Sequence, residues 1–202
     1  MIGNKLEQSI ISVFQENLSE TFSINSVSKI LKKSYPNINK KSNFLLKEGI
    51  LGKITIGNSY QCFLNLNNDK AKIYIAINEL NKRDSLIQRD KIFQAIIDEI
   101  QQIGKRHNIE TVMLYKKNLL FVCDNIEIKQ EIQNMSFLTK DFVLLFIDRK
   151  TFQERFLADY DLQKYHYVLL NTENYANIIS ELNDRLLMKR FIDKARTTKN
   201  ES

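Results

Sequence analysis

The sequence predicts an α+β protein with an N-terminal domain of three helices and a β-hairpin, a helical connector, and a small C-terminal α/β domain. Residues 5–19 and 69–106 carry apolar side chains at helical spacing. Between them, residues 53–64 change to the pattern of two short strands around a Gly-Asn turn. From residue 107 onward, strand-like and helix-like segments alternate, as in layered α/β domains.

The composition narrows the class of protein. The chain has 202 residues, which is enough for one or two compact domains, and 43 % of them are hydrophobic and 27 % charged, as in ordinary globular proteins. The apolar runs are too short to span a bilayer, and no apolar signal segment follows Met1. Cys62 and Cys123 occur singly inside strand-like segments. These features predict a cytoplasmic protein with buried, reduced thiols and no membrane contact.

The first two helices follow from apolar spacing and capping. The helix over residues 5–19 and the next one each have one apolar face. Ser23 is the expected N-cap of the second helix. We expect this helix to end near Ser34, because Tyr35 precedes the only proline of the chain and is disfavoured from helical geometry. The apolar residues that predict the two buried faces are Leu6, Ile10, Val13, Phe14, Leu18, Ile24, Val27, Ile30 and Leu31.

The third helix and the hairpin complete the N-terminal domain. Asn37 is the expected N-cap of the third helix, and Gly49 ends it because glycine readily adopts the left-handed conformation. Within this helix, Ile38, Ser42 and Leu45 share one face, which we expect to be buried. Two short strands, residues 53–56 and 60–64, then form the predicted hairpin.

This order of elements is that of a winged helix-turn-helix domain. Residues 38–51 resemble the recognition helix of bacterial and archaeal winged-helix regulators, which ends in leucine, three residues, glycine and two aliphatic residues, here Leu45, Gly49, Ile50 and Leu51. Residues 60–66 look like the second wing strand and its exit. Ser42 departs from the family, which usually has a larger apolar residue there. The resemblance implies a DNA-binding domain over residues 1–68 of an archaeal protein.

The positive charge of the chain is concentrated in this domain. Seven lysines and one acid, Glu48, lie between Lys29 and Lys53, which accounts for the whole net charge of +6. A charge concentrated in one short segment favours a polyanionic partner. A solvated lysine-rich surface is the alternative reading, and charge alone does not separate the two.

The outward positions of the third helix are the expected base contacts, because asparagine pairs well with adenine and lysine with guanine. We assign base reading to Asn39, Lys40 and Asn43, and phosphate contact to Lys33, Lys41 and Lys53. Asn58 and Tyr60 of the wing serve either DNA contact or the turn and strand packing. The complete predicted DNA-binding set is Lys33, Asn37, Asn39, Lys40, Lys41, Asn43, Lys47, Lys53, Asn58 and Tyr60.

The connector, residues 69–106, reads as two helices with their weakest junction at Asp84-Ser85. Its apolar stripe includes Ile92, Ile96 and Ile100 and is wider than one small domain needs. Two alternatives remain open for this stripe. It packs either between the subunits of a homodimer, since winged helices usually bind paired half-sites, or against the α/β domain of the same chain.

The C-terminal domain, residues 107–186, has predicted strands at 111–115 and 119–123 and a fully buried strand at 142–147. Predicted helices are centred on Ile128–Met135, Phe152–Leu157 and residues 161–186, and Asp148 caps the second of them. The expected core includes Phe121, Phe142, Leu144 and Phe146. A basic tail, residues 187–202, follows.

The order of these segments looks like the minimal nucleotidyltransferase domain that archaea often fuse behind a winged helix. That family has Gly-Ser after its first strand, an Asp-x-Asp pair opening the second, and a third carboxylate, and these acids hold two magnesium ions. Here no Gly-Ser follows the first strand, and Lys116 and Asn118 occupy the two aspartate positions. Only Asp141 matches the third acid. The resemblance therefore implies a degenerate, non-catalytic copy.

The sequence has few other signs of catalysis. His107 and His166 lack zinc-ligand spacing, and no phosphate loop or nucleophile elbow is present. We therefore expect no enzyme activity, no cofactor, no metal site and no small-molecule substrate. The predicted function is sequence-specific binding of double-stranded DNA in transcriptional regulation. The alternatives are a non-enzymatic protein- or RNA-interaction adaptor and a nucleotidyltransferase-type antitoxin.

Overall fold

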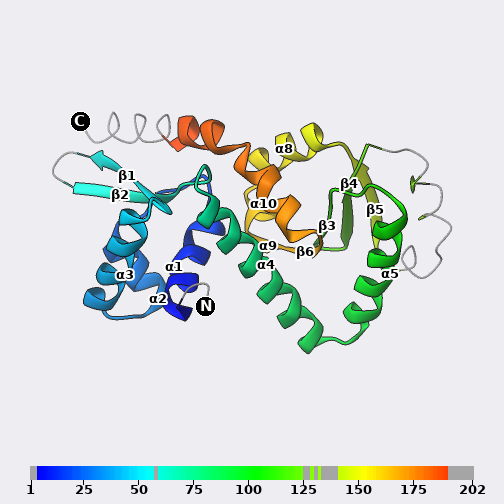
Figure 1. Cartoon of the computed structure of the whole chain (residues 1–202), viewed down its shortest axis with the longest axis horizontal. Coiled ribbons are helices and arrows are strands. Elements are labelled where there is room, and N and C mark those ends of the chain that lie inside the picture. Colours follow the sequence, from blue (N-terminus) through cyan, green and yellow to red (C-terminus); the bar gives the residue numbers. More distant parts are fainter. Residues whose placement is uncertain (1–3, 57–58, 125–127, 130–131, 133–140, 191–202) are drawn as a thin grey trace. The chain divides into compact units, whose positions relative to one another are not determined.

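The computed structural model describes residues 4–56, 59–124, 128–129, 132 and 141–190 (Figure 1). Helices and two separate β-sheets, one of two strands and one of four, make up the described chain. The predicted α+β class is thereby confirmed. The chain divides into two compact units, of which one combines Met1–Ile75 with Ile179–Ser202 and the other is Ala76–Ile178. Within the described ranges, no helix has the length and the apolar character that crossing a membrane requires.

The first unit contains α1 (Lys5–Gln15), α2 (Ile24–Leu31), α3 (Tyr35–Lys47), β1 (Leu51–Ile56) and β2 (Ser59–Leu64) (Figure 1). This is the predicted order of three helices and two strands. A capping box starts α1, in which Asn4 accepts a hydrogen bond from the Leu6 amide and Glu7 accepts one from the Asn4 amide. The helices pack on one another, α1 also contacts β2, and α3 contacts β1.

The start of α3 differs from the prediction. Ser23 caps α2 as expected, by accepting a hydrogen bond from the Ser26 amide at 3.0 Å. However, α2 already ends at Leu31, where Lys32 turns left-handed with φ of 51°. The next helix begins at Tyr35 with Ser34 as its N-cap, so Asn37 lies inside the helix and does not cap it. Proline is tolerated in the first turn because an N–H there would have no intrahelical acceptor.

The hairpin is antiparallel, with register from Leu51 opposite Leu64 to Ile56 opposite Ser59. Gly49 ends α3 with φ of +69°, as predicted. The predicted turn residue Asn58 lies outside the described residues. Gly52 meets the ring of Phe63 so closely that an added Cβ would lie 2.3 Å from it. Glycine at this position therefore lets the aromatic ring cover β1.

The buried faces of the first helices agree with the predicted stripes in part. Ile10, Phe14, Val27 and Leu18 are buried, whereas Ile30 is half exposed. Ile30 falls in the last turn of α2, because the helix ends at Leu31, before the left-handed Lys32. Cys62 is a buried free thiol, as predicted, and burial raises its pKa to about 11.

The C-terminal segment belongs to the first unit. Residues 183–190 are helical, and the Arg190 guanidinium is buried. Its Nε donates to the carbonyl oxygen of Leu18 at 2.9 Å, and its guanidinium carbon lies 4.9 Å from the centre of the Phe63 ring. Burial lowers the pKa of Arg190 to about 10. Arg190 was predicted to lie in a basic tail, but its guanidinium is buried inside the unit and donates to the Leu18 carbonyl. The remaining tail residues, 191–202, lie outside the described residues.

The second unit is built on a sheet of order β5-β4-β3-β6. β3 pairs antiparallel with both β4 and β6, whereas β4 and β5 are parallel. Figure 1 shows α5 on one side of this sheet and α8 to α10 on the other. The elements are α4 (Asp69–Arg89, which begins in the first unit), α5 (Ile92–Arg106), β3 (Thr111–Tyr115), β4 (Asn118–Val122), β5 (Val143–Ile147), α8 (Arg149–Ala158), α9 (Tyr160–Tyr165), β6 (His166–Leu170) and α10 (Thr172–Ser180).

Both faces of the central strands are buried. Every residue of β3 is buried, because alternate side chains enter cores on opposite faces of the sheet. The core on the α5 side includes Ile96, Ile97, Ile100, Ile103, Val112, Leu114, Leu119 and Phe121. Ile96 and Ile100 thus take the intramolecular alternative, whereas Ile92 is 46 % exposed. The homodimer stays a prediction.

The connector differs from the sequence reading in two ways. α4 continues through Asp84-Ser85, and the break falls at Asp90, whose side chain accepts a hydrogen bond from the Ile92 amide at 3.0 Å. Ile73 was predicted to lie on the buried face but is 44 % exposed. The buried face of α4 instead contains the polar residues Asn78 and Glu79, which hydrophobic periodicity does not count.

Two strands of the second unit were also misjudged. Residues 166–170 were assigned to a helix but form β6, which pairs with β3. β5 is half-buried rather than fully buried because it lies at the edge of the sheet. Phe121 is buried as predicted, and Phe142, Leu144 and Phe146 are partly buried against the core. The predicted cap is confirmed, since Asp148 accepts a hydrogen bond from the Thr151 amide at 2.8 Å.

Two buried carboxylates make the stability of the protein depend on pH. Burial raises the pKa of Glu7 and of Glu79, but cationic partners outweigh it, so both pKa values lie below the usual value. A carboxyl whose pKa is lower in the folded state stabilises the fold above its unfolded pKa and loses that contribution as pH falls through its folded pKa. We therefore expect the free energy of unfolding in urea to decrease below about pH 5. In the Glu7→Gln, Glu79→Gln double variant this decrease should be shallower, and an identical pH profile would contradict the assignment.

Candidate nucleic-acid interface

One face of α3 is turned inward and the other is open. Ile38, Ser42 and Leu45 are buried, as predicted. The opposite face presents Asn37, Lys40, Asn43, Phe44 and Lys47, all of which are exposed, and the partly exposed Asn39. We call this row of six residues the outer row of α3.

The two asparagines predicted to read bases lie next to each other. Asn43 donates through Nδ2 to Oδ1 of Asn39 at 3.3 Å, across one helical turn. This hydrogen bond orders the two amides relative to one another. Each amide keeps further donor or acceptor capacity, because a carboxamide has two donor hydrogens and an oxygen with two lone pairs.

The lysines around the outer row differ in their partners. In the described structure, Lys33, Lys40 and Lys47 are exposed and form no salt bridge. Lys53 on β1 lies 5.6 Å from the centre of the Tyr60 ring on β2, which holds its ammonium against the hairpin. Tyr60 is 36 % exposed, and burial, followed by Cys62 and Tyr35, raises its pKa. The tyrosine is therefore a neutral hydrogen-bonding group at neutral pH.

Lys41 has a structural role. Its Nζ lies 2.7 Å from Oε1 of Glu7, and the Tyr74 hydroxyl donates to the other oxygen of the same carboxylate at 3.2 Å. Glu7 is nearly buried, so losing its cationic partner would leave an unpaired charge inside the unit. Lys41 was predicted to contact phosphate, but its ammonium holds α3 to α1, and we leave it out of the proposed contacts.

Phe44 is the residue of this face that the sequence reading missed. It is 45 % exposed and lies one turn from both Lys40 and Lys47. Helical spacing alone places it on the outward side, opposite Ile38 and Leu45. An apolar ring on an exposed helical face is a candidate contact, because exposed large apolar groups that are clustered with charges mark interaction surfaces.

The residues at the nucleotidyltransferase-like positions do not form an acidic cluster. Lys116 occupies the β3–β4 turn with φ of 56°, and its Nζ lies 3.8 Å from Oδ2 of Asp161. Asn118 starts β4 and pairs with Val143, and Asp141 is exposed just before β5. Among the described residues, no group of three or more His, Cys, Asp or Glu side chains could hold a metal ion.

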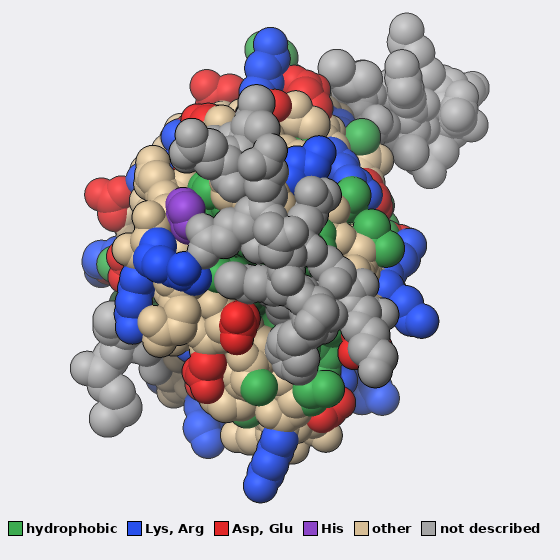
Figure 2. Space-filling model, turned by 90° about the vertical axis from the view of Figure 1, so that its right-hand side faces the viewer, with side chains coloured by type: hydrophobic (Ala, Val, Ile, Leu, Met, Phe, Trp, Pro, Cys, Tyr) green, Lys and Arg blue, Asp and Glu red, His purple; other side chains and the backbone are tan. Residues whose placement is uncertain are grey.

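The charges of the second unit are mixed in sign. On the side of the molecule that carries α5 and β5, Figure 2 shows Lys and Arg side chains interspersed with Asp and Glu side chains. This contrasts with the segment Lys29–Lys53, where seven of eight charged residues are lysines. The segment with this concentration of positive charge belongs to the first unit, which is therefore the expected binding site for an anionic polymer.

We compared the chain with models of protein families, with curated proteins and with solved structures. No family model, curated protein or solved structure matches the chain. The winged-helix and nucleotidyltransferase resemblances therefore depend on the motif residues quoted above.

Proposed function

We propose that the chain binds double-stranded DNA sequence-specifically, with the first unit acting as a winged helix-turn-helix, and that it regulates transcription. The observation that carries the proposal is the outer row of α3, which combines two hydrogen-bonded amides with lysines that form no salt bridge among the described residues, on an open helical face. The lysines beside this row supply the charge that a polyanion attracts. The function follows from this site, since a fold alone supports many functions.

In this proposal α3 enters the major groove, which admits an α-helix and displays a distinct pattern for each base pair. Asn43 and Asn39 contact adenine, whose N6 and N7 match a carboxamide, and Lys40 contacts guanine. Phe44 adds an apolar contact to the methyl group of thymine. The bases preferred by this set are therefore mainly A·T pairs.

The remaining cations position the protein on the duplex. Lys33 precedes α3, Lys47 is its last residue, and Lys53 and Tyr60 lie on the hairpin, so the phosphate contacts come from both ends of α3 and from the wing. Such contacts fix register and orientation without selecting sequence. The second unit then serves assembly or sensing.

The full chain should select a preferred sequence from a pool of random DNA duplexes. Fluorescence anisotropy then compares the selected duplex, a scrambled duplex and an RNA duplex of the same sequence over a range of salt concentrations. We expect tighter binding to the selected DNA than to either control, with a steep salt dependence. If no sequence is enriched, base reading is wrong, and if RNA binds as well as DNA, the RNA-adaptor alternative replaces the proposal.

Replacing Asn43 by alanine should weaken binding to the selected duplex by about 1–3 kcal/mol and leave binding to the scrambled duplex nearly unchanged. The reason is that Asn43 contacts a base edge and neutralises no phosphate. Asn81→Ala removes an equivalent amide from an exposed position of α4 and should change neither affinity. Equal losses on both duplexes would show that Asn43 does not read sequence.

A further inference from the structure

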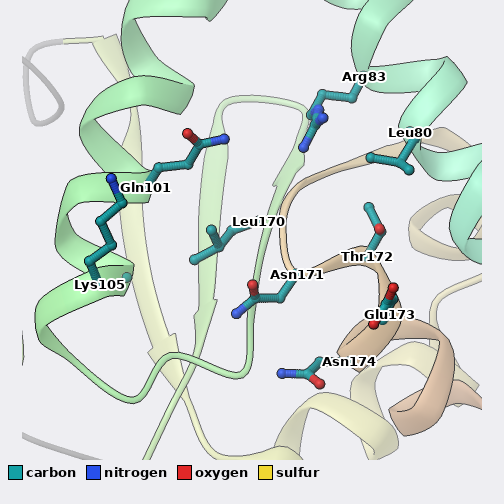
Figure 3. Close-up of a pocket in the computed structure, with 10 residues that line it drawn as sticks. Leu80, Arg83, Gln101, Lys105, Leu170, Asn171, Thr172, Glu173 and Asn174 are labelled. Atoms are coloured by element: carbon teal, nitrogen blue, oxygen red, sulfur yellow. The ribbon is translucent and has the colours of Figure 1, made fainter.

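A pocket of about 550 Å³ lies within the second unit (Figure 3). Its walls come from three elements that are distant in sequence. Arg83 extends into it from α4, Gln101 and Lys105 belong to α5, and Asn171 and Asn174 lie at the junction of β6 and α10. In Figure 3 the side chains of Arg83 and Gln101 point toward each other across the opening, and Lys105 runs along its α5 edge. This volume is in the range of small-ligand sites.

Arg83, which lines the pocket, has one donor that the described protein leaves without an acceptor. Nε of Arg83 is buried and has no hydrogen-bond partner among the described residues. Oδ1 of Asp84 is 3.8 Å away, beyond hydrogen-bond distance, and the Asp84 side chain is 59 % exposed. Since buried N–H groups are nearly always paired, an unpaired guanidinium nitrogen indicates a missing acceptor. A phosphate or carboxylate oxygen is the acceptor that guanidinium geometry fits best.

The remaining groups agree with an anionic ligand. Lys105 adds a second cation, against one acidic side chain in the wall, Glu173. α10 begins at Thr172, and its first three residues, whose N–H groups have no intrahelical acceptors, line the same pocket. Asn171 directly before it has φ of 55° and donates to the Ile109 carbonyl at 2.8 Å, which anchors the turn to the loop before β3.

The rest of the lining indicates a ligand larger than a bare anion. Leu80 and Leu170 provide apolar surface, and Gln101 and Asn174 provide amide donors and acceptors. We propose that the pocket binds a phosphate monoester of about mononucleotide size. Arg83 and Lys105 hold the phosphate, and the amides and leucines hold the sugar or base. The proposal is independent of DNA binding, because every lining residue lies within Ala76–Ile178.

Isothermal titration calorimetry of the full chain tests this with AMP, GMP, CMP and UMP, and with adenosine and inorganic phosphate as partial ligands. At least one mononucleotide should bind with one site per chain, and both partial ligands should bind about tenfold more weakly or worse. Arg83→Gln and, separately, Lys105→Gln should each weaken mononucleotide binding by about tenfold or more. Arg106→Gln, on α5 but outside the pocket, is the charge-matched control and should not.

Three results would overturn the proposal. The first is failure of every mononucleotide to bind, and the second is unchanged affinity in both pocket variants. The third is a partial ligand that binds as tightly as the mononucleotides. Tight binding of adenosine would show that the pocket does not recognise the phosphate group. Tight binding of inorganic phosphate would show that the pocket does not recognise the sugar or base. Lys105 is exposed, so its replacement keeps the test valid even if Arg83→Gln does not fold.

Discussion

The triple variant Lys33→Ala, Lys47→Ala, Lys53→Ala should lose about 10- to 1000-fold in affinity for every DNA duplex at about 50 mM salt. Each lysine that neutralises a phosphate releases a counterion and contributes about 0.9 to the slope of log affinity against log salt concentration. The slope should therefore fall by about three, and the preference for the selected sequence should remain. Anisotropy titrations at several salt concentrations measure both quantities.

A second triple variant separates local contact from net charge. Lys91, Lys129 and Lys150 are exposed residues of the second unit, and replacing them by alanine removes the same charge. We expect a much smaller change in the salt slope, because the proposal assigns no phosphate contact to these three lysines. Equal slopes in both triple variants would place the DNA contacts outside the α3 and hairpin face.

Glu79→Ala should destabilise the second unit by about 3–5 kcal/mol, the usual cost of breaking a buried ion pair. Glu79 is fully buried, with Oε1 at 3.2 Å from Nζ of Lys82 and 3.5 Å from Nε2 of His166. The Leu162 carbonyl accepts a hydrogen bond from Nδ1 of His166 at 2.7 Å, which holds the imidazole ring beside Glu79. Removing the carboxylate takes the ion-pair partner away from Lys82 and a polar neighbour away from the buried His166 ring.

Urea unfolding at pH 7 measures the effect. Asp98→Ala, which removes an exposed acid from α5, should change the free energy of unfolding by less than about 0.5 kcal/mol. Glu79→Gln keeps the volume and should be less destabilising than Glu79→Ala, because an amide oxygen still accepts from Lys82. A variant Glu79→Ala as stable as the control would mean that the buried cluster contributes no net stability.

The N-terminal elements could be predicted because their signals are local. Ser23, Gly49 and the strand pattern of residues 60–64 each act over a few residues, and the structure has the cap, the helix end and the strand that they predict. Helical spacing likewise predicted that Ile38, Ser42 and Leu45 are buried and that the opposite face of α3 is exposed, as the structure has it. Helical spacing also places Phe44 on the outward face, but its apolar ring cannot form the hydrogen bonds by which polar side chains contact base edges.

β6 could not be found in this way. Its residues His166–Leu170 are mostly buried, so they show no alternation that distinguishes a strand from a buried helix. Pairing with β3 decides its conformation, and β3 lies about fifty residues earlier in the chain. The pocket depends on the same pairing, since the turn after β6 supplies one of its walls.

The sequence by itself determined the α+β class, the order of the first five elements and the concentration of lysines beside α3, because periodicity, caps and charge are properties of neighbouring residues. Tertiary structure alone decided which charges are available. Lys41 is bound by Glu7 of α1, and Arg190 by the carbonyl of Leu18. Arg83 lines a pocket, and its Nε has no hydrogen-bond partner among the described residues. The partner of a charged side chain comes from a distant part of the chain, and burial there sets whether the charge stabilises the fold or remains free for a ligand.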